Sequence, residues 1–143
     1  MITVRVVSST PGVLFLCTHN AGRSQMAAGW LRHLGSGLVR VHSAGSEPAE
    51  SVNPIAVEAM AEVGIDISGM EPSHWTEEML DDADVVISMG CGDACPVYQG
   101  KRYLDWPIPD PAGQDLKMVR HVRDQVHGHV RWLLAELGIG TTD

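Results

Sequence analysis

Hydrophobic and polar positions along the chain switch between strand-like and helix-like spacing. Short apolar runs at 13–16 and 84–89 predict strands buried on both faces, and alternating residues at 39–43 predict another strand. A shorter segment near 101–106 predicts a fourth strand. Elsewhere apolar residues recur every three or four positions, which predicts helices over residues 24–34, 54–63, 75–82 and 114–137.

Capping signals agree with two of these helices. Asn53 followed by Pro54 is typical of a helix start, and Gly64 is typical of a helix end. The next helix has two candidate N-caps, Ser73 and Thr76. The helix boundaries at 54–63 and 75–82 therefore rest on local chemistry as well as on periodicity.

The alternation of strands and helices predicts an α/β fold with a central, mainly parallel sheet. In such folds ligands bind beyond the carboxyl ends of the strands. Cys17, Ser43 and the segment that begins at Gly90 each follow a predicted strand. We therefore expect these three parts of the chain to meet at one edge of the sheet.

The composition is that of a globular protein. Hydrophobic residues make up 44% and charged residues 20% of the 143 residues. We expect one domain over residues 1–143, with residues 1–10 as a short N-terminal extension. No apolar run is long enough to cross a membrane, and the N-terminus lacks the apolar core of a secretory signal. The sequence therefore predicts a cytoplasmic protein without a membrane partner.

The net charge of −8 restricts the ligands to be expected. Nucleic acids select basic surfaces, so the sequence predicts no nucleic-acid partner. An acidic protein also repels an anionic substrate at long range. An anion site therefore has to be built locally, from backbone amides and arginine.

The sequence CTHNAGRS leads from Cys17, at the end of the first strand, into the first helix. A loop in this position turns its backbone amides toward one point, where the helix dipole favours a thiolate. The small residues Ala21 and Gly22 let the loop curl around an oxyanion, and Arg23 adds a bidentate guanidinium. We therefore predict that Cys17 is a nucleophile in an oxyanion cradle made of Thr18, His19, Asn20, Ala21, Gly22 and Arg23.

Two further residues complete the candidate chemistry of the cradle. Ser24 is expected to cap the first helix and to donate a hydrogen bond to the sulfur. Asp110 lies between Pro109 and Pro111, which fix its backbone, and it is the candidate general acid that protonates a departing oxygen. Asp105 is the competing carboxylate.

Cys91 and Cys95 follow the third predicted strand, and with Cys17 they make an odd number that does not suit a framework of structural disulfides. Cβ atoms at i and i+4 of a helix lie about 5–6 Å apart, whereas a disulfide needs about 3.5–4.5 Å. A bond between Cys91 and Cys95 would therefore require local unwinding, and we interpret residues 90–100 as a redox-switchable element. A zinc site of three cysteines and a histidine is the competing interpretation, but the metal would occupy the thiolate that the cradle prepares.

Taken together, these motifs resemble a known family. They are CTHNAGRSQMA at 17–27, HSAG at 42–45, EVGIDIS at 62–68, CGDACP at 91–96 and DPAG at 110–113. They resemble the arsenate reductases of the low-molecular-weight tyrosine phosphatase superfamily. The resemblance implies a three-layer sandwich with a central, mainly parallel four-stranded sheet. One departure is Gly22, because many relatives carry a second cysteine just before the arginine.

The resemblance also implies a reaction sequence, with arsenate as the substrate and arsenic detoxification as the function. Cys17 attacks arsenic, Arg23 and the loop amides bind the oxyanion, Ser24 supports the thiolate, and Asp110 protonates the departing oxygen. Cys91 then attacks the sulfur of Cys17 and releases arsenite. Cys95 next attacks Cys91, and the resulting disulfide is reduced by thioredoxin or by another thiol reductant.

The family resemblance leaves alternatives for the activity and for a bound ion. One alternative is a tyrosine phosphatase, although Ala112 stands where those enzymes usually carry an aromatic residue after the Asp-Pro pair. Another is a redox or oxyanion sensor without catalysis, and weak phosphatase side activity is expected in either enzyme. No tightly bound cofactor is expected. Some relatives bind a potassium ion beside the loop, and the residues that match its ligands are Asn20 and Ser43.

Overall fold

The computed structural model describes residues 10–90 and 100–140. Within them, one sheet is formed by four strands, β1 (Gly12–Cys17), β2 (Arg40–Gly45), β3 (Val85–Ser88) and β4 (Arg102–Asp105). The strand order is β2-β1-β3-β4, and all three neighbouring pairs are parallel. The prediction of a central parallel sheet with four strands is confirmed. The predicted N-terminal extension lies outside the described residues except for Thr10.

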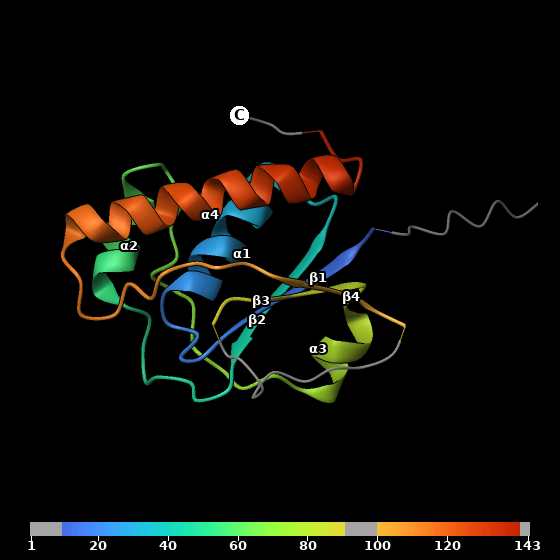
Figure 1. The fold of residues 1–143 in the computed structure, drawn as a ribbon, viewed down its shortest axis with the longest axis horizontal. Coiled ribbons are helices and arrows are strands. Elements are labelled where there is room, and N and C mark those ends of the chain that lie inside the picture. The colour runs from blue at the N-terminus through green and yellow to red at the C-terminus, as the bar shows by residue number, and fades with distance from the viewer. Residues whose placement is uncertain (1–9, 91–99, 141–143) are drawn as a thin grey trace, which may run out of the picture.

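Helices cover both faces of the sheet, so the molecule has the three layers that the family resemblance implies (Figure 1). One face carries α1 (Arg23–Gly35), α2 (Pro54–Ala61) and α4 (Leu116–Glu136). The opposite face carries the short α3 (Glu77–Asp82). No helix among residues 10–90 and 100–140 combines the length and the apolar character that a membrane crossing needs.

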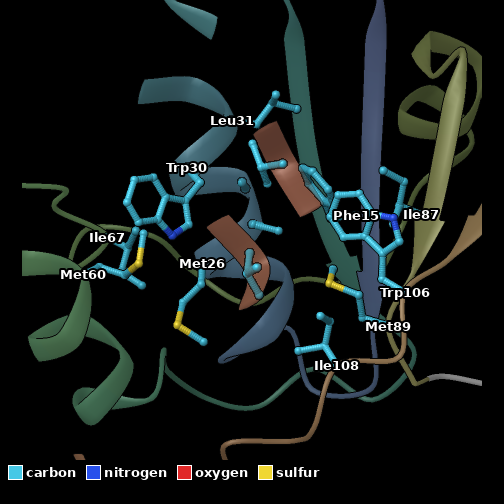
Figure 2. Close-up of a cluster of buried hydrophobic side chains, with 14 of the residues drawn as sticks. Phe15, Met26, Trp30, Leu31, Met60, Ile67, Ile87, Met89, Trp106 and Ile108 are labelled. Atoms are coloured by element: carbon cyan, nitrogen blue, oxygen red, sulfur yellow. The ribbon is translucent and has the colours of Figure 1, made fainter. Parts of the chain in front are cut away.

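Alternate side chains of β1 enter two separate apolar clusters, as the period of a strand requires. Phe15 faces α1 and α4 in the larger cluster, where its ring lies 5.7 Å from that of Trp106 (Figure 2). Leu14 and Leu16 face the other way and pack against Leu80 of α3. All six residues of β1 are buried, and the strand lies between β2 and β3 in the sheet.

The N-caps of α2 and α3 follow the local sequence signals. The side chain of Asn53 accepts a hydrogen bond from the backbone N–H of Ile55 at 2.9 Å, as predicted for the start of α2. Of the two candidate caps of α3, Thr76 takes the position and accepts from Met79 at 3.1 Å. Helix α2 ends two residues before its predicted end, and α3 begins two residues after its predicted start. The apolar pattern marks buried positions, whereas the backbone hydrogen bonds decide where a helix begins and ends.

Candidate active site

Cys17 is the last residue of β1, and the loop that follows it is hydrogen-bonded to the segment 46–53. The carbonyl oxygens of the loop accept hydrogen bonds from backbone N–H groups of that segment, in the pairs Cys17–Ser46 at 3.2 Å, Thr18–Glu47 at 2.8 Å, His19–Ala49 at 3.0 Å and Ala21–Asn53 at 2.9 Å. A trans peptide places its C=O and N–H on opposite sides. The N–H groups that follow these carbonyls therefore point away from the segment 46–53, as the predicted oxyanion cradle would require.

The sulfur of Cys17 is buried, with 2% of the residue exposed, and it lies among hydrogen-bond donors. Ser24 Oγ is 2.9 Å from Sγ, and the backbone N–H of Asn20 donates to Sγ at 3.3 Å. Asn20 reaches this geometry with a φ of 52°, in the left-handed region. Both groups can stabilise negative charge on the sulfur.

The predicted cap role of Ser24 is wrong, although its predicted contact with the sulfur is present. Helix α1 begins at Arg23, its N-cap is Gly22, and no side chain caps it. Ser24 therefore lies inside the first turn. Its hydroxyl is directed at Cys17 and at the amide of Asn20, whose Nδ2 donates to Ser24 Oγ at 2.6 Å.

Arg23 is 7% exposed and is held by groups from two distant parts of the chain. Its Nη1 donates to the carbonyl of Ile108 at 3.3 Å, and its Nη2 lies 3.6 Å from Oδ2 of Asp110. Gly90, which has a φ of 93°, packs directly on the guanidinium, where a Cβ atom would collide with Nη1. Arg23 also lines the cavity that contains Cys17.

That cavity has a volume of about 270 Å³. It is lined by Cys17, His19, Ala21, Gly22, Arg23, Ala49, Asn53, Asp110, Pro111, Ala112 and Gly113. Among these described residues no phenyl, phenol or indole ring lines the cavity, and six of them are alanine, glycine or proline: Ala21, Gly22, Ala49, Pro111, Ala112 and Gly113. The shape and the donors suit a small anion that is bound by backbone amides and one guanidinium.

Of the two candidate acids, Asp110 shares the cavity with Cys17 and Asp105 does not. The Oδ1 atom of Asp110 accepts from the backbone N–H of Ala112 at 3.0 Å, so Oδ2 is left to face Arg23. The carboxylate of Asp105 instead accepts from Ser88 Oγ at 2.8 Å. The loop that carries Asp110 packs closely against Gly22. A side chain at Gly22 would prevent this contact, because its Cβ atom would lie 2.7 Å from Cγ of Pro111.

The remaining predicted site residues have different places. Thr18 is outside the cavity lining, and its hydroxyl donates to the carbonyl of Gly90 at 3.3 Å. His19 lines the cavity and pairs its Nδ1 with the carbonyl of Glu47 at 3.1 Å. Cys91 and Cys95 lie outside the described residues.

Asn20 and Ser43 are the two residues that we expect near a potassium ion, and Asn20 uses its side-chain oxygen in contacts within the protein. The side-chain oxygen of Asn20 accepts from the backbone N–H of Ser73 at 3.0 Å and from Nε2 of Gln25 at 3.2 Å. A carbonyl oxygen has two lone pairs, and here both face N–H donors instead of a cation. Ser43, the second expected ligand, lies in β2 opposite Phe15.

Several contacts of the site escaped sequence reasoning. They come from the segment 46–53, Ile108 and Gln25, which hold the cradle through backbone atoms or through an amide side chain. Gly90 begins a segment that was expected at this edge, but its contact with Arg23 was not predicted. Gln25 does belong to the motif CTHNAGRSQMA, so the motif was the one available signal for it. The other contacts depend on how distant segments pack.

Comparison with known proteins agrees with the geometry of the site. The "Glutaredoxin arsenate reductase" of Synechocystis sp. is 44% identical over 129 residues, which cover 87% of this chain and 97% of that protein. The structure of a thioredoxin-dependent arsenate reductase of Corynebacterium glutamicum matches with a TM-score of 0.81 and 41% identity. The match covers 93% of this chain, which spans 64% of the length of that chain.

A further solved structure, described as an arsenate reductase in the phosphate binding state, matches with a TM-score of 0.77 and 40% identity. It covers 88% of this chain and 98% of that chain. Residues 12–140 match the family described as low molecular weight phosphotyrosine protein phosphatase. The chain, with its buried thiol at the head of an amide-lined loop, therefore belongs to the low molecular weight phosphotyrosine protein phosphatase family.

Proposed function

We propose that the protein reduces arsenate to arsenite, with Cys17 as the nucleophile. The observation that carries this proposal is the placement of a buried thiol, an arginine and a carboxylate around one cavity of about 270 Å³. A tetrahedral oxyanion fits in that cavity, and the absence of a phenyl, phenol or indole ring from its described lining disfavours a phosphotyrosine side chain. Relatives at about 40% identity are arsenate reductases, which supports the same choice of substrate.

The first step is an attack of the Cys17 thiolate on arsenic. The oxyanion is bound by the inward amides of the loop and by Arg23, which neutralise its charge. Asp110 gives a proton to the departing oxygen, which leaves as water, and a sulfur–arsenic bond is formed. The product is a Cys17–arsenate adduct, which still contains pentavalent arsenic.

The second step transfers two electrons to arsenic. The thiolate of Cys91 attacks the sulfur of Cys17, the sulfur–arsenic bond breaks, and arsenite leaves with the electron pair. Gly90 supports this role for Cys91, because Gly90 packs on the arginine of the cradle and Cys91 is the next residue in the sequence. Cys95 then attacks Cys91 and expels the Cys17 thiolate, which returns the nucleophile to its first state.

The Cys91–Cys95 disulfide is re-reduced by a dithiol protein of the thioredoxin type in this proposal. Two cysteines beyond the nucleophile support that choice, because they complete an internal disulfide that a dithiol can reduce by exchange. A glutaredoxin with a low-molecular-weight thiol is the alternative donor. Either donor requires a reducing compartment, such as the cytoplasm.

The cysteine steps are tested with three variants, Cys17→Ser, Cys91→Ser and Cys95→Ser. Arsenite production is followed with thioredoxin, thioredoxin reductase and NADPH, and a glutaredoxin system is run in parallel. We expect Cys17→Ser to be inactive and Cys95→Ser to stop after one turnover, with a Cys17–Cys91 disulfide visible by mass spectrometry. Sustained turnover of Cys95→Ser with thioredoxin would contradict the cascade.

Hydrolysis of p-nitrophenyl phosphate provides the control for folding of the cradle. We expect weak hydrolysis, because tetrahedral phosphate fits the same donors as arsenate. The Cys91→Ser and Cys95→Ser variants should retain this hydrolysis, and Cys17→Ser should lose it. Phosphatase turnover that far exceeds arsenate reduction in the wild-type protein would favour the phosphatase function instead.

A further inference from the structure

Gln25 is a buried polar residue of α1 with no place in the reaction sequence above. It is 2% exposed, and it does not line the cavity that contains Cys17. Its Nε2 donates to the backbone carbonyl of Asn20 at 3.1 Å and to the side-chain oxygen of Asn20 at 3.2 Å. Both bonds end on the one residue of the loop that has a positive φ.

The directions of these hydrogen bonds are fixed by a backbone group. The N–H of Ser73 donates to the side chain of Asn20 at 3.0 Å, so the accepting atom is the oxygen and the other atom is the NH₂ group. Two oxygen atoms of Asn20 then face Gln25, so Gln25 presents its NH₂ group to them. These contacts fix which atom is oxygen and which is nitrogen in the side-chain amides of Asn20 and Gln25.

A chain of donors therefore runs from Gln25 to the sulfur. The NH₂ group of Asn20 donates to Ser24 Oγ at 2.6 Å. Because a lone pair of this hydroxyl is already occupied, its single proton is available to Cys17 Sγ at 2.9 Å. The backbone N–H of Asn20 adds a second donor to the same sulfur at 3.3 Å.

We propose that Gln25 is a positioning residue that holds Asn20 in its left-handed conformation, so that both donors of the Cys17 thiolate stay aligned without a potassium ion. Two contacts support the independence from potassium. The N–H groups of Gln25 and Ser73 both donate to the side-chain oxygen of Asn20, which a cation would need as a ligand. The inference rests on the proposed role of Cys17 as nucleophile. It does not depend on the identity of the substrate or on the later cysteine steps.

The test is the pH profile of alkylation of Cys17 by iodoacetamide, read by mass spectrometry of the peptide that contains Cys17. In Gln25→Met, which keeps the length of the side chain and removes its donors, we expect the midpoint to rise by about 0.5 to 1 pH unit, the effect of weakening charge-assisted hydrogen bonds. Gln125→Met, the same change at an exposed position of α4, should leave the midpoint unchanged. His19, Arg23 and Asp110, the titratable groups that share the cavity with Cys17, are kept in every variant.

A double-variant cycle shows whether Gln25 acts through Asn20. Asn20→Gly keeps access to the positive φ and removes the side chain, so Gln25→Met should shift the midpoint less in that background than in the wild-type protein. An equal shift in both backgrounds, or no shift in Gln25→Met, would overturn the positioning role. An unfolding midpoint from thermal melting accompanies each variant.

The potassium part is tested on the wild-type protein, so it does not depend on whether a variant folds. The alkylation midpoint and the KM for p-nitrophenyl phosphate should be equal in KCl and in NaCl at the same ionic strength. A severalfold change in either quantity with potassium would overturn it. Neither readout requires arsenate, so a failure here is distinct from a failure of the proposed arsenate reduction.

Discussion

The local geometry of Asp110, the proposed general acid, is compatible with a proton transfer. One carboxylate oxygen is fixed by the N–H of Ala112, and the other faces Arg23 at 3.6 Å. The side chain is 48% exposed, so water has access to the carboxyl group. The pair with Arg23 is accordingly weak in energy and acts mainly to orient the carboxylate.

Replacement of Asp110 by asparagine tests the acid. We expect the rate of arsenite formation to fall by about 10²- to 10⁴-fold, the usual contribution of general acid catalysis. The measurement is the initial rate in the coupled assay with saturating arsenate. Asp105→Asn is the matched control, because Asp105 bonds to Ser88 and is absent from the lining of the cavity that contains Cys17.

A rate of Asp110→Asn close to the wild-type rate would remove Asp110 from the mechanism. It would also favour an oxyanion sensor, which needs the cradle and the thiols but no acid. An equal loss in Asp105→Asn would show that the effect is not specific to the carboxyl group in the cavity.

At the scale of elements, helices α2 and α4 are joined at the end of α2 by one carboxylate and two guanidinium groups. Glu62 accepts from Arg120 at 2.6 Å and from Arg123 at 2.9 Å. The hydrogen bond from Arg120 is the main cause that lowers the pKa of Glu62 from 4.5 to about 2. Arg123 also donates to the carbonyl of Ala59, which ties the last turn of α2 to α4.

The lowered pKa of Glu62 makes the stability of this contact depend on pH. A carboxyl group with a depressed folded-state pKa contributes above its unfolded value and loses that contribution as the pH falls through the folded value. The advantage of the wild-type protein over Glu62→Gln should therefore be full above pH 4.5 and should disappear as the pH approaches about 2. Urea unfolding midpoints at several pH values measure this difference.

Glu50→Gln, at an exposed position outside α2 and α4, is the control for the removal of one negative charge. The difference in urea unfolding midpoint between Glu50→Gln and the wild-type protein should not disappear between pH 4.5 and about 2 in the same way. A pH-independent difference for Glu62→Gln would mean that the carboxylate stabilises the helix pair by packing alone.

At the scale of the whole molecule, three segments that follow different strands converge on Arg23. The cradle follows β1, Gly90 follows β3, and Ile108 and Asp110 follow β4. The hydroxyl of Thr18 also donates to the carbonyl of Gly90, so the cradle and the end of β3 are tied at two points. The position of the guanidinium therefore depends on how the segments after β1, β3 and β4 pack together.

A methyl group at Gly90 should disturb this assembly at the arginine. We expect Gly90→Ala to raise the KM for arsenate by about 10- to 100-fold, the effect of losing one hydrogen bond to a charged group, with a smaller change in kcat. The methyl group would collide with Nη1 of Arg23 and displace the guanidinium. Steady-state kinetics with varied arsenate provide the measurement.

Gly100→Ala is a matched control for backbone strain. Gly100 has a φ of 84°, close to the 93° of Gly90, but no atom of the described residues lies within 4 Å of a Cβ built there. This variant should lose stability without the change in KM. Equal effects of the two substitutions on KM would show that backbone strain, and not the contact with Arg23, is responsible.

The sequence by itself determined the strands, the helices and the loop from Cys17 to Arg23, because these depend on residues that are close together in the sequence. Strands β1 and β3 follow from short apolar runs, and Cys17 to Arg23 form one continuous loop whose residue types suit an oxyanion. Asp110 was also accessible, because two flanking prolines mark it. The N-cap predicted at Ser24 lies two residues earlier, at Gly22, because the loop around Cys17 and not the capping preference of serine sets where α1 begins.

Only the tertiary structure decided how the cradle is held. The carbonyls of the loop are turned outward by the segment 46–53, the guanidinium is enclosed by Gly90 and Ile108, and Asn20 is braced by Gln25 and Ser73. Most of these contacts join residues separated by about 30 to 85 positions and use backbone atoms, which every residue type possesses. A pattern of side chains carries no signal for such contacts, and they exist because parallel strands bring their carboxyl ends to one edge of the sheet.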